Sequence, residues 1–392
     1  LLQLRNNLTY DASLSTKLGS WEEHTDCCSW RGVHCDDAGH VIDLDLSSDS
    51  ITGNLDDSST LFSLRFLRRL SLAGNSFDST DLPKGFGLLN QLVYLNLSET
   101  GFAGQIPSNF SRMSWLVTLD LSTFSPGYVL SLKLQNPNLN MLVQNLTRLI
   151  ELRLDGVDIA AAGVDWCDAV SSALPDLQVL SLSNCNISGP FDSSLAKLQS
   201  LSVIKLDGNK FSASLPGFFA KFANLTTLSA SSCDLLGEAP QQIFQLPTLR
   251  TIDLSNNGEL GGCLPEFPDN GFLESLDLSY TSFSGNLPDS VDNLKKLSSL
   301  KLFGCNFSGP IPSSISNLSQ LVSVDLAVNH FTGSLPSFTL SRNLSSVSLR
   351  DNKLMGKIPL EWEGLKHLTI LDLSNNSLSG ELPAFLFSLP SL

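Results

Sequence analysis

The sequence predicts an α/β solenoid, in which short structural repeats stack along one axis. Three observations support this prediction. Leucines recur in the spacing Leu-x-x-Leu-x-Leu, an Asn or Cys follows most of these groups, and several repeats then carry Gly-x-Ile/Leu-Pro. The pattern begins fourteen times, most often at intervals of 24 residues. The repeats start at Val41, Leu67, Leu92, Leu116, Leu149, Leu177, Leu201, Leu225, Leu249, Leu273, Leu297, Leu321, Leu344 and Leu368.

A period in the twenties with this leucine spacing is typical of a leucine-rich repeat, which supplies one strand and one looser return segment. The 392 residues would strain a single globular core, whereas a solenoid adds one thin core per repeat. We predict an N-terminal cap at residues 1–40. An array of fourteen repeats is predicted over residues 41–392, where the chain stops at the first residue of a fifteenth.

Alternation along each strand separates core residues from surface residues. In the repeat that begins at Leu297, the pattern places Leu300 and Leu302 inward, and Lys301 and Phe303 outward. Stacked strands of this kind form a parallel sheet, whose outward residues line its concave face.

An Asn or Cys at the eighth position after the start is predicted to lie inside the solenoid. An inward Asn can hydrogen-bond the turns of adjacent repeats, and Cys is small enough to replace it. No basic side chain accompanies these cysteines, so they are interpreted as reduced core thiols. The position holds Asn75, Asn209, Asn257, Asn329, Asn352, Asn376, Cys185, Cys233 and Cys305. Two residues later, a phenylalanine spine is expected from Phe77, Phe102, Phe211, Phe283, Phe307 and Phe331.

The first 40 residues do not follow the repeat, and we expect them to cover the first core face. Leu1, Leu4 and Leu8 share one face of a predicted helix, and residues 13–23 are predicted to form a second helix that ends near Trp21.

Three cysteines in this cap raise a choice between a metal site and a disulfide. Cys27, Cys28 and Cys35 lie close in sequence to three histidines, but they lack the paired spacing that zinc sites usually show. We therefore predict a disulfide between Cys28 and Cys35. The expected partner of Cys27 is a cysteine just before Leu1. Partners for Cys167 and Cys263 do not follow from the sequence.

Composition limits the class of function. The 24 basic and 39 acidic residues give a net charge of −15, which argues against nucleic acid as the main partner. No run of 18 apolar residues occurs, so any membrane anchor is expected outside this chain. The histidines are scattered, and neither a phosphate-binding loop nor a catalytic arrangement is present, so we expect no enzyme, cofactor or metal.

Ten Asn-x-Ser/Thr sequons indicate the secretory pathway, although these residue types are also common in the repeat itself. The predicted glycosylation sites are Asn7, Asn96, Asn109, Asn145, Asn186, Asn224, Asn306, Asn317, Asn343 and Asn375. A glycan on Asn96 would stand on the concave face and close its first third to a large ligand.

The recurrent Gly-x-Ile/Leu-Pro motif makes the resemblance more specific. Proline removes a hydrogen-bond donor, so the motif suits an edge or an irregular return segment. With this motif, the repeat LxxLxxLxLSxNxLxGxIPxxxxNL resembles the plant extracellular leucine-rich repeat. The cap, with DCCSWRGVHC at residues 26–35, is similar to that of plant receptor-like proteins and receptor kinases. Segments 58–64, 116–123, 151–158, 165–185 and 278–290 resemble receptor-like proteins of the Verticillium-resistance and Cf type.

This resemblance covers the whole chain and implies a right-handed superhelix. It also implies the extracellular part of a plant plasma-membrane immune receptor, which binds a microbial protein or peptide. Signalling is then expected through an adaptor receptor kinase and a co-receptor kinase of the somatic-embryogenesis (SERK) type. The alternatives are a secreted inhibitor of a microbial wall-degrading enzyme such as polygalacturonase, and a peptide-hormone receptor.

Departures from the repeat are the candidate binding positions. The intervals from Leu116 to Leu149 and from Leu149 to Leu177 are 33 and 28 residues, so residues 116–176 are predicted to carry a loop. Loop candidates are Phe124 and Tyr128, since exposed aromatic side chains often anchor ligands. The candidates on the concave face are Tyr94, Arg153, Asp155, Lys205, Asp207, Tyr280, Lys301 and Phe303.

Overall fold

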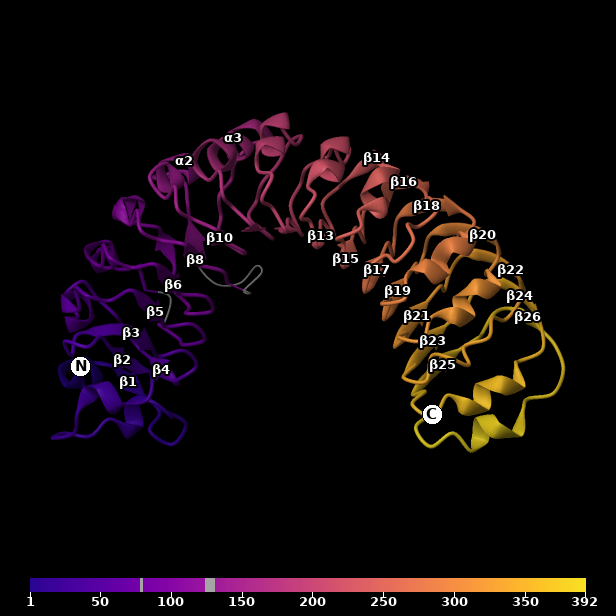
Figure 1. Cartoon of the computed structure of the whole chain (residues 1–392), viewed down its shortest axis with the longest axis horizontal. Coiled ribbons are helices and arrows are strands. Elements are labelled where there is room, and N and C mark those ends of the chain that lie inside the picture. Colours follow the sequence, from indigo (N-terminus) through magenta and orange to yellow (C-terminus); the bar gives the residue numbers. More distant parts are fainter. Residues whose placement is uncertain (78–79, 124–130) are drawn as a thin grey trace. The chain divides into compact units, whose positions relative to one another are not determined.

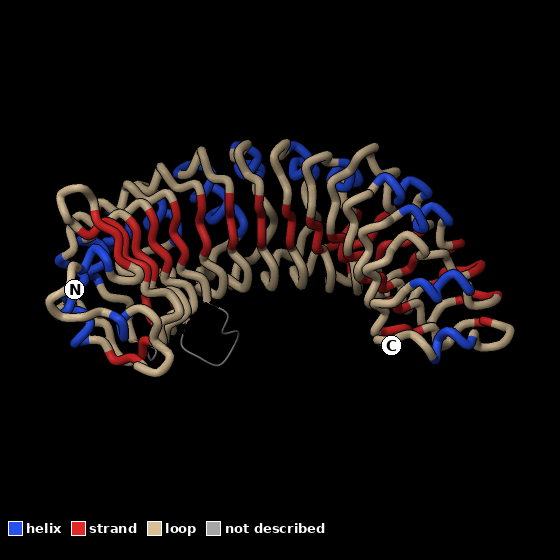
Figure 2. Tube along the Cα trace, turned by 60° about the horizontal axis from the view of Figure 1, so that its bottom comes forward, coloured by secondary structure: helices blue, strands red, loops and turns tan. Residues whose placement is uncertain are grey.

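The computed structural model describes residues 1–77, 80–123 and 131–392. The chain divides into two compact units, Leu1–Leu201 and Ser202–Leu392. Figure 1 labels helices and strands of both. In each unit, the strands of the main sheet lie on one side and the repeat helices on the other (Figure 2).

The first unit is built on one sheet in which β2 is antiparallel to β3 and the other neighbours are parallel. Its strands are β2 (Val33–Cys35), β3 (Val41–Asp45), β5 (Arg69–Ser71), β6 (Tyr94–Asn96), β8 (Thr118–Asp120), β10 (Glu151–Arg153) and β11 (Val179–Ser181). Two short pairs accompany it: β1 (Thr9–Tyr10) with β4 (Ile51–Thr52), and β7 (Gly104–Gln105) with β9 (Leu132–Lys133). The helices are α1 (Leu2–Asn7), α2 (Leu139–Val143) and α3 (Gly163–Ala173), with 3-10 turns at Leu18–Ser20, Cys27–Ser29, Thr60–Ser63, Lys84–Leu88, Ser108–Arg112 and Ser193–Lys197.

The second unit carries two parallel sheets. The main sheet contains β12 (Val203–Lys205), β13 (Thr227–Ser229), β15 (Thr251–Asp253), β17 (Ser275–Asp277), β19 (Ser299–Lys301), β21 (Ser323–Asp325), β23 (Ser346–Ser348) and β25 (Ile370–Asp372). The second sheet contains β14 (Leu236–Glu238), β16 (Glu259–Cys263), β18 (Ser282–Gly285), β20 (Asn306–Pro310), β22 (His330–Ser334), β24 (Lys353–Gly356) and β26 (Ser377–Leu378). The 3-10 helices are Gly217–Lys221, Gln241–Gln245, Asp289–Asn293, Ser313–Asn317, Leu360–Gly364 and Ala384–Phe387.

Register in both main sheets follows the predicted alternation. Leu70 pairs with Leu44 and Leu95 in the first unit, and Leu300 pairs with Leu276 in the second. All of these leucines are buried. One strand per repeat therefore places its central leucine in the core and its two neighbours on the opposite surface.

The Asn/Cys position forms the predicted internal ladder. Asn75 donates to the carbonyl oxygens of Leu46 and Leu72, and its Oδ1 accepts from the N–H groups of Asp49 and Ile51. The sulfur of Cys233 lies 3.1 Å from the Leu206 carbonyl oxygen, which it can bond as a thiol donor. The expected phenylalanine spine is also buried, with the rings of Phe77 and Phe102, and of Phe307 and Phe331, stacked.

Three sequence-based expectations need correction, beginning with the second helix of the cap. Only Leu18–Ser20 within residues 13–23 is helical, as a single 3-10 turn. The N–H groups of Thr16, Lys17 and Leu18 each donate to the buried carboxylate of Asp49 at a distance of 2.8 Å. These bonds hold the cap on the first repeat. The segment uses its backbone donors for this contact rather than for a helix.

The return segment is also more regular than predicted in the second unit. Gly285, Gly309 and Gly356 belong to strands of the second sheet, so this part of the motif is ordered and paired. The proline is placed as its chemistry suggests, because Pro312 occupies the N-cap of the next 3-10 helix, where no N–H is needed.

The third correction concerns the long repeat that begins at Leu116. Residues 131–146 follow the return path, because β9 pairs with β7 and Lys133 bridges to Asp158 in the following repeat. Leu132, Leu142 and Leu146 are buried. The loop predicted within residues 116–176 therefore does not include these residues.

Candidate functional site

The outward-facing side chains of each main sheet are here called the strand face of that unit. The residues four positions after each repeat start lie in register from strand to strand, and most of them are Asp, Ser or Asn. The row of the first unit is Asp45, Ser71, Asn96, Asp120, Arg153 and Ser181. The row of the second unit is Lys205, Ser229, Asp253, Asp277, Lys301, Asp325, Ser348 and Asp372.

The repeated aspartates hold the turns that follow the strands. Asp253 Oδ1 accepts from the N–H and hydroxyl of Ser255 at 3.0 and 2.7 Å. Burial raises the pKa of Asp253 above its usual range, and the neighbouring charge of Asp277 adds to this shift. Burial likewise raises the pKa of Asp120 in the first unit. These carboxylates thus have a structural role, and they make the strand face acidic.

Asp155 and Asp207 have matching partners in the two units. Asp155 accepts from the hydroxyl of Ser181 and from the N–H of Ser183 at 2.7 Å, each in the next repeat. Asp207 accepts in the same way from Ser229 and Ser231 at 2.6 and 2.8 Å. Both side chains therefore tie adjacent repeats together, and a role in ligand binding remains a prediction for them.

The predicted cations differ in their surroundings. Arg153 Nε lies 2.6 Å from Glu151 Oε1 on the same strand, and both side chains are half-buried. Lys301 Nζ lies 3.4 Å from Asp277 on the neighbouring strand. Lys205 is the last residue of β12 and is half-buried. Their binding role also remains a prediction.

Tyr94 belongs to a hollow of about 650 Å³ between the cap and the first strands. The Arg69 guanidinium lies 4.2 Å from the centre of its ring, and the Asn96 amide donates to its hydroxyl at 3.3 Å. Lys17 pairs with Asp45 at another part of the wall. A glycan on Asn96, which remains a prediction, would occupy this hollow.

Tyr280 and Phe303 are brought together in the second unit. Their ring centres are 4.8 Å apart with the planes tilted by 58°, and Arg350 lies 5.5 Å from the Phe303 ring. Arg350 was not among the binding residues predicted from the sequence. The signal was available, because Phe303 and Arg350 occupy the sixth position after the repeat start, which is Ser in repeats such as that of Ser255 and Ser279.

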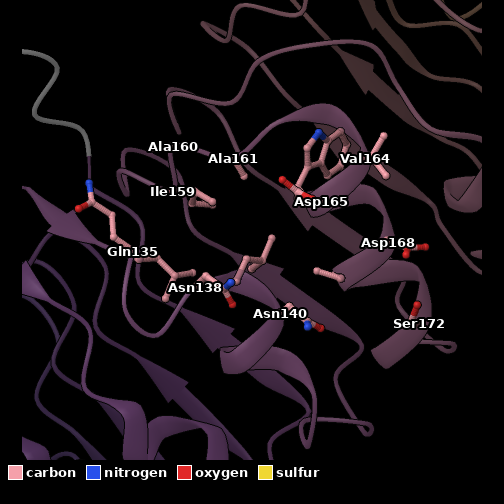
Figure 3. Close-up of a pocket in the computed structure, with 14 residues that line it drawn as sticks. Gln135, Asn138, Asn140, Ile159, Ala160, Ala161, Val164, Asp165, Asp168 and Ser172 are labelled. Carbon is pink, nitrogen blue, oxygen red and sulfur yellow. The ribbon is translucent and has the colours of Figure 1, made fainter.

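The irregular repeats of the first unit contain a cavity of about 630 Å³ between α2 and α3. Figure 3 shows Asp165, Asp168 and Ser172 on α3, and Asn138 and Asn140 at the start of α2. It is a mixed polar and apolar recess that no sequence pattern indicated. The loop candidates Phe124 and Tyr128 lie outside the described residues.

The cap contains the predicted disulfide between Cys28 and Cys35. The sulfur of Cys27 lies within 4.8 Å of both, but two of the three sulfurs are already bonded to each other, which leaves an incomplete ligand set for zinc. Burial raises the pKa of the Cys167 and Cys233 thiols to about 12, and it raises those of Cys185 and Cys305 as well. Cys185, Cys233 and Cys305 are thus consistent with the predicted reduced core thiols, and Cys167 is a further buried thiol.

Accessibility of the sequons is uneven. Asn96 and Asn109 are half-buried, and the Asn109 amide donates to the Lys84 carbonyl. The other eight predicted glycosylation sites are exposed. Modification at all ten remains a prediction. Among the residues that the structure describes, no helix has the length and apolar character needed to cross a membrane.

Comparison with known families agrees with the repeat and the cap. Residues 1–36 match the leucine rich repeat N-terminal domain, and residues 175–235 match a leucine rich repeat model. Single repeats match at 91–113, 272–294, 296–318 and 367–389.

Receptor-like protein 6 of Arabidopsis thaliana is 36% identical over 193 residues, which cover 49% of this chain and 19% of that protein. The receptor-like protein Cf-9 homolog of Solanum lycopersicum is 35% identical over 142 residues, covering 36% and 16%. The matched residues of the chain thus cover less than a fifth of the length of these relatives.

Among solved structures, the Arabidopsis receptor kinase HAESA, in complex with the peptide hormone IDA and the co-receptor SERK1, is similar over the whole chain. The TM-score is 0.83 with 30% identity, and 67% of that chain is covered. With its cap, its repeats and this similarity, the chain belongs to the leucine-rich-repeat ectodomains of plant receptors.

Proposed function

We propose that this chain is the ligand-recognition part of a cell-surface immune receptor, which binds a microbial protein or peptide on a strand face and signals through partner receptor kinases. The partners would be an adaptor receptor kinase and a SERK-type co-receptor, at the outer side of the plasma membrane. Membrane attachment would come from sequence outside this chain.

The observation that carries the proposal is a contrast on the strand face of the second unit and in the turns that follow its strands. Asp253 and the other repeated aspartates are engaged in their own turns, whereas Tyr280 keeps 55% of its surface exposed beside Phe303. Exposed aromatic side chains among polar neighbours are typical of protein-binding surfaces. Relatives named receptor-like proteins support the receptor class.

A peptide-hormone receptor is the second candidate, because the similar HAESA structure holds a peptide hormone and a co-receptor. Both candidates use a peptide-binding face, and they differ in the source of the ligand.

The test is to express the full-length gene product that contains this chain in leaf tissue and to capture it after exposure to two materials. One is culture filtrate of plant-pathogenic fungi and bacteria, and the other is apoplastic fluid of healthy plants. We expect a filtrate component to bind, to trigger an oxidative burst and to recruit a receptor kinase. Binding and signalling from healthy apoplastic fluid alone would overturn the immune assignment in favour of a hormone receptor.

A further inference from the structure

The turns after the strands share one backbone geometry, and two residues are unusual in it. The seventh residue after the repeat start has positive φ in each of the following turns, and this left-handed region suits Gly, Asn and Asp best. The residues are Ser48, Gly74, Glu99, Gly156, Asn184, Gly208, Ser232, Asn256, Tyr280, Gly304, Val328, Asp351 and Asn375. Tyr280 and Val328, at φ 56° and 55°, are the bulky side chains of the series.

Burial of the side chain does not offset the cost of positive φ at either residue. Tyr280 is 55% exposed and Val328 is 37% exposed, so both place apolar surface in solvent. A β-branched or aromatic residue in the left-handed region costs free energy, and such outliers concentrate at functional positions. The fold alone therefore gives no reason for these two side chains.

The two residues belong to one continuous surface. Tyr280 N–H donates to the Phe303 carbonyl at 2.7 Å, Gly304 N–H to that of Ala327 at 3.0 Å, and Val328 N–H to that of Arg350 at 3.0 Å. These bonds join the turns of successive repeats side by side.

Gly304, between Tyr280 and Val328, leaves room for the tyrosine ring. A Cβ added there would meet Tyr280 Cδ1 at 3.3 Å, so the ring lies against the glycine backbone. We call Tyr280, Phe303, Gly304, Val328 and Arg350 the turn patch.

Charge around the turn patch is unbalanced. Lys301 pairs with Asp277 at 3.4 Å, and Arg350 pairs with Asp351 at 2.8 Å and approaches Asp372 at 3.8 Å. Asp325 lies in the same row, and burial raises its pKa, with the Asp277 charge contributing. Two cations thus face four carboxylates, Asp277, Asp325, Asp351 and Asp372. A ligand that brings positive charge would relieve this excess.

We propose that the turn patch binds a basic peptide segment of the protein ligand, with an aromatic or aliphatic side chain on Tyr280 and Val328. A lysine or arginine beside that side chain would point toward Asp325. This inference rests on the proposed function, since it assigns the ligand chemistry of the same strand face.

The test uses a random dodecapeptide display library as the probe, selected on the folded, secreted chain. We expect peptides that combine an aromatic or aliphatic residue with adjacent Lys or Arg, and that bind more weakly as salt is raised. The double variant Tyr280→Asn/Val328→Gly should weaken these peptides by about 10- to 30-fold. Ser232→Asn, at the same turn position elsewhere in the second unit, should leave binding unchanged.

Stability supplies the second readout. Because Asn and Gly suit positive φ, the double variant should unfold about 2–4 °C higher than the wild type. Loss of binding with gained stability cannot come from misfolding. Acidic or wholly apolar selected peptides, unchanged binding in the double variant, or lower stability would each overturn the inference.

Self-association of the wild-type chain that the double variant abolishes would also overturn it, because the patch would then contact a second copy. Failure of the proposed function is distinguishable, since it would appear as absent binding of microbial filtrate while peptide selection on the turn patch still succeeds.

Discussion

The Asn257 side chain holds the turn of its own repeat and that of the preceding repeat. Its amide donates to the carbonyl oxygens of Leu254 and Ala230, at 2.8 and 2.9 Å. Its Oδ1 accepts from the N–H groups of Cys233 and Leu235, at 3.0 and 2.9 Å. The residue is 1% exposed, so water cannot replace these bonds if the side chain is removed.

Replacing Asn257 by Ala should lower the free energy of unfolding by about 2–4 kcal/mol, because buried backbone groups lose their partners. Asn257→Cys should cost less than half as much, since Cys233 fills the same position with its sulfur 3.1 Å from the Leu206 carbonyl oxygen. Urea unfolding followed by circular dichroism measures both variants. Equal losses in the two would contradict the role assigned to the polar ladder.

Single residues also show where sequence reasoning reaches its limit. The inward orientation of Asn257 and Phe307 could be predicted, because the repeat period shows which side chains point into the core. The period could not say that Asp155 binds Ser181 and Ser183 of the next repeat, since this depends on the distance between neighbouring turns. It could have pointed to Arg350, which departs from the common Ser at its position.

At the scale of elements, α3 is the clearest departure from the regular repeat. The helix extends over 11 residues, buries Trp166 and Val170, and contacts the following 3-10 helix at Ser193–Lys197. The 28-residue interval signalled extra length but not its form, because an apolar stretch can pack as a helix or as a loop according to its neighbours. The second sheet was missed for a similar reason, since its short strands are stabilised by pairing between repeats.

The first residue of α3 lies close to the backbone of Pro190 in the following repeat. Gly163 is buried, and a Cβ added there would overlap the carbonyl oxygen of Pro190. The backbone of Pro190 cannot move aside as a flexible side chain would. We expect Gly163→Ala to lower the free energy of unfolding by about 1–3 kcal/mol.

The matched control is Gly217→Ala, at the first residue of a 3-10 helix in the second unit. Apart from its two neighbours in the chain, no heavy atom of the described residues lies within 4 Å of its added Cβ, so this change should be neutral or stabilise by up to about 1 kcal/mol. Thermal unfolding of the two variants separates close packing from a general effect of losing glycine. A neutral Gly163→Ala would show that α3 can shift away from Pro190.

At the scale of the whole molecule, the excess of acid has a structural origin as well as a functional meaning. The net charge is −15, and Asp45, Asp120, Asp277 and Asp372, from the four Leu-Asp-Leu-Ser segments, contribute to it. Within a strand face they differ, because burial raises the pKa of Asp253 and Asp325, whereas the pKa of Asp372 is lowered, mainly by its bond to the Ser374 hydroxyl. The same sequence position therefore stabilises the fold in one repeat and costs stability in another.

This difference predicts opposite effects of two identical substitutions. Raising the pKa of Asp253 above 3.8 means that the folded chain binds its proton more tightly than the unfolded chain. Its ionisation then lowers stability as pH rises from about 4 toward neutrality. Asp253→Asn keeps the oxygen that accepts from Ser255 and removes the charge, so it should raise the unfolding temperature at pH 7 by about 1–2 °C.

Asp372→Asn should act with the other sign. The pKa of Asp372 is lowered in the folded chain, so its carboxylate stabilises the fold above pH 4, and this contribution is lost as pH falls through the folded pKa. The variant should therefore unfold at a slightly lower temperature than the wild type at pH 7.

At pH 3 the gain from Asp253→Asn should disappear, because Asp253 is then protonated in the folded and unfolded wild-type chains. Calorimetric scans at both pH values measure these shifts, and a gain from Asp253→Asn that persists at pH 3 would show that packing rather than charge explains it.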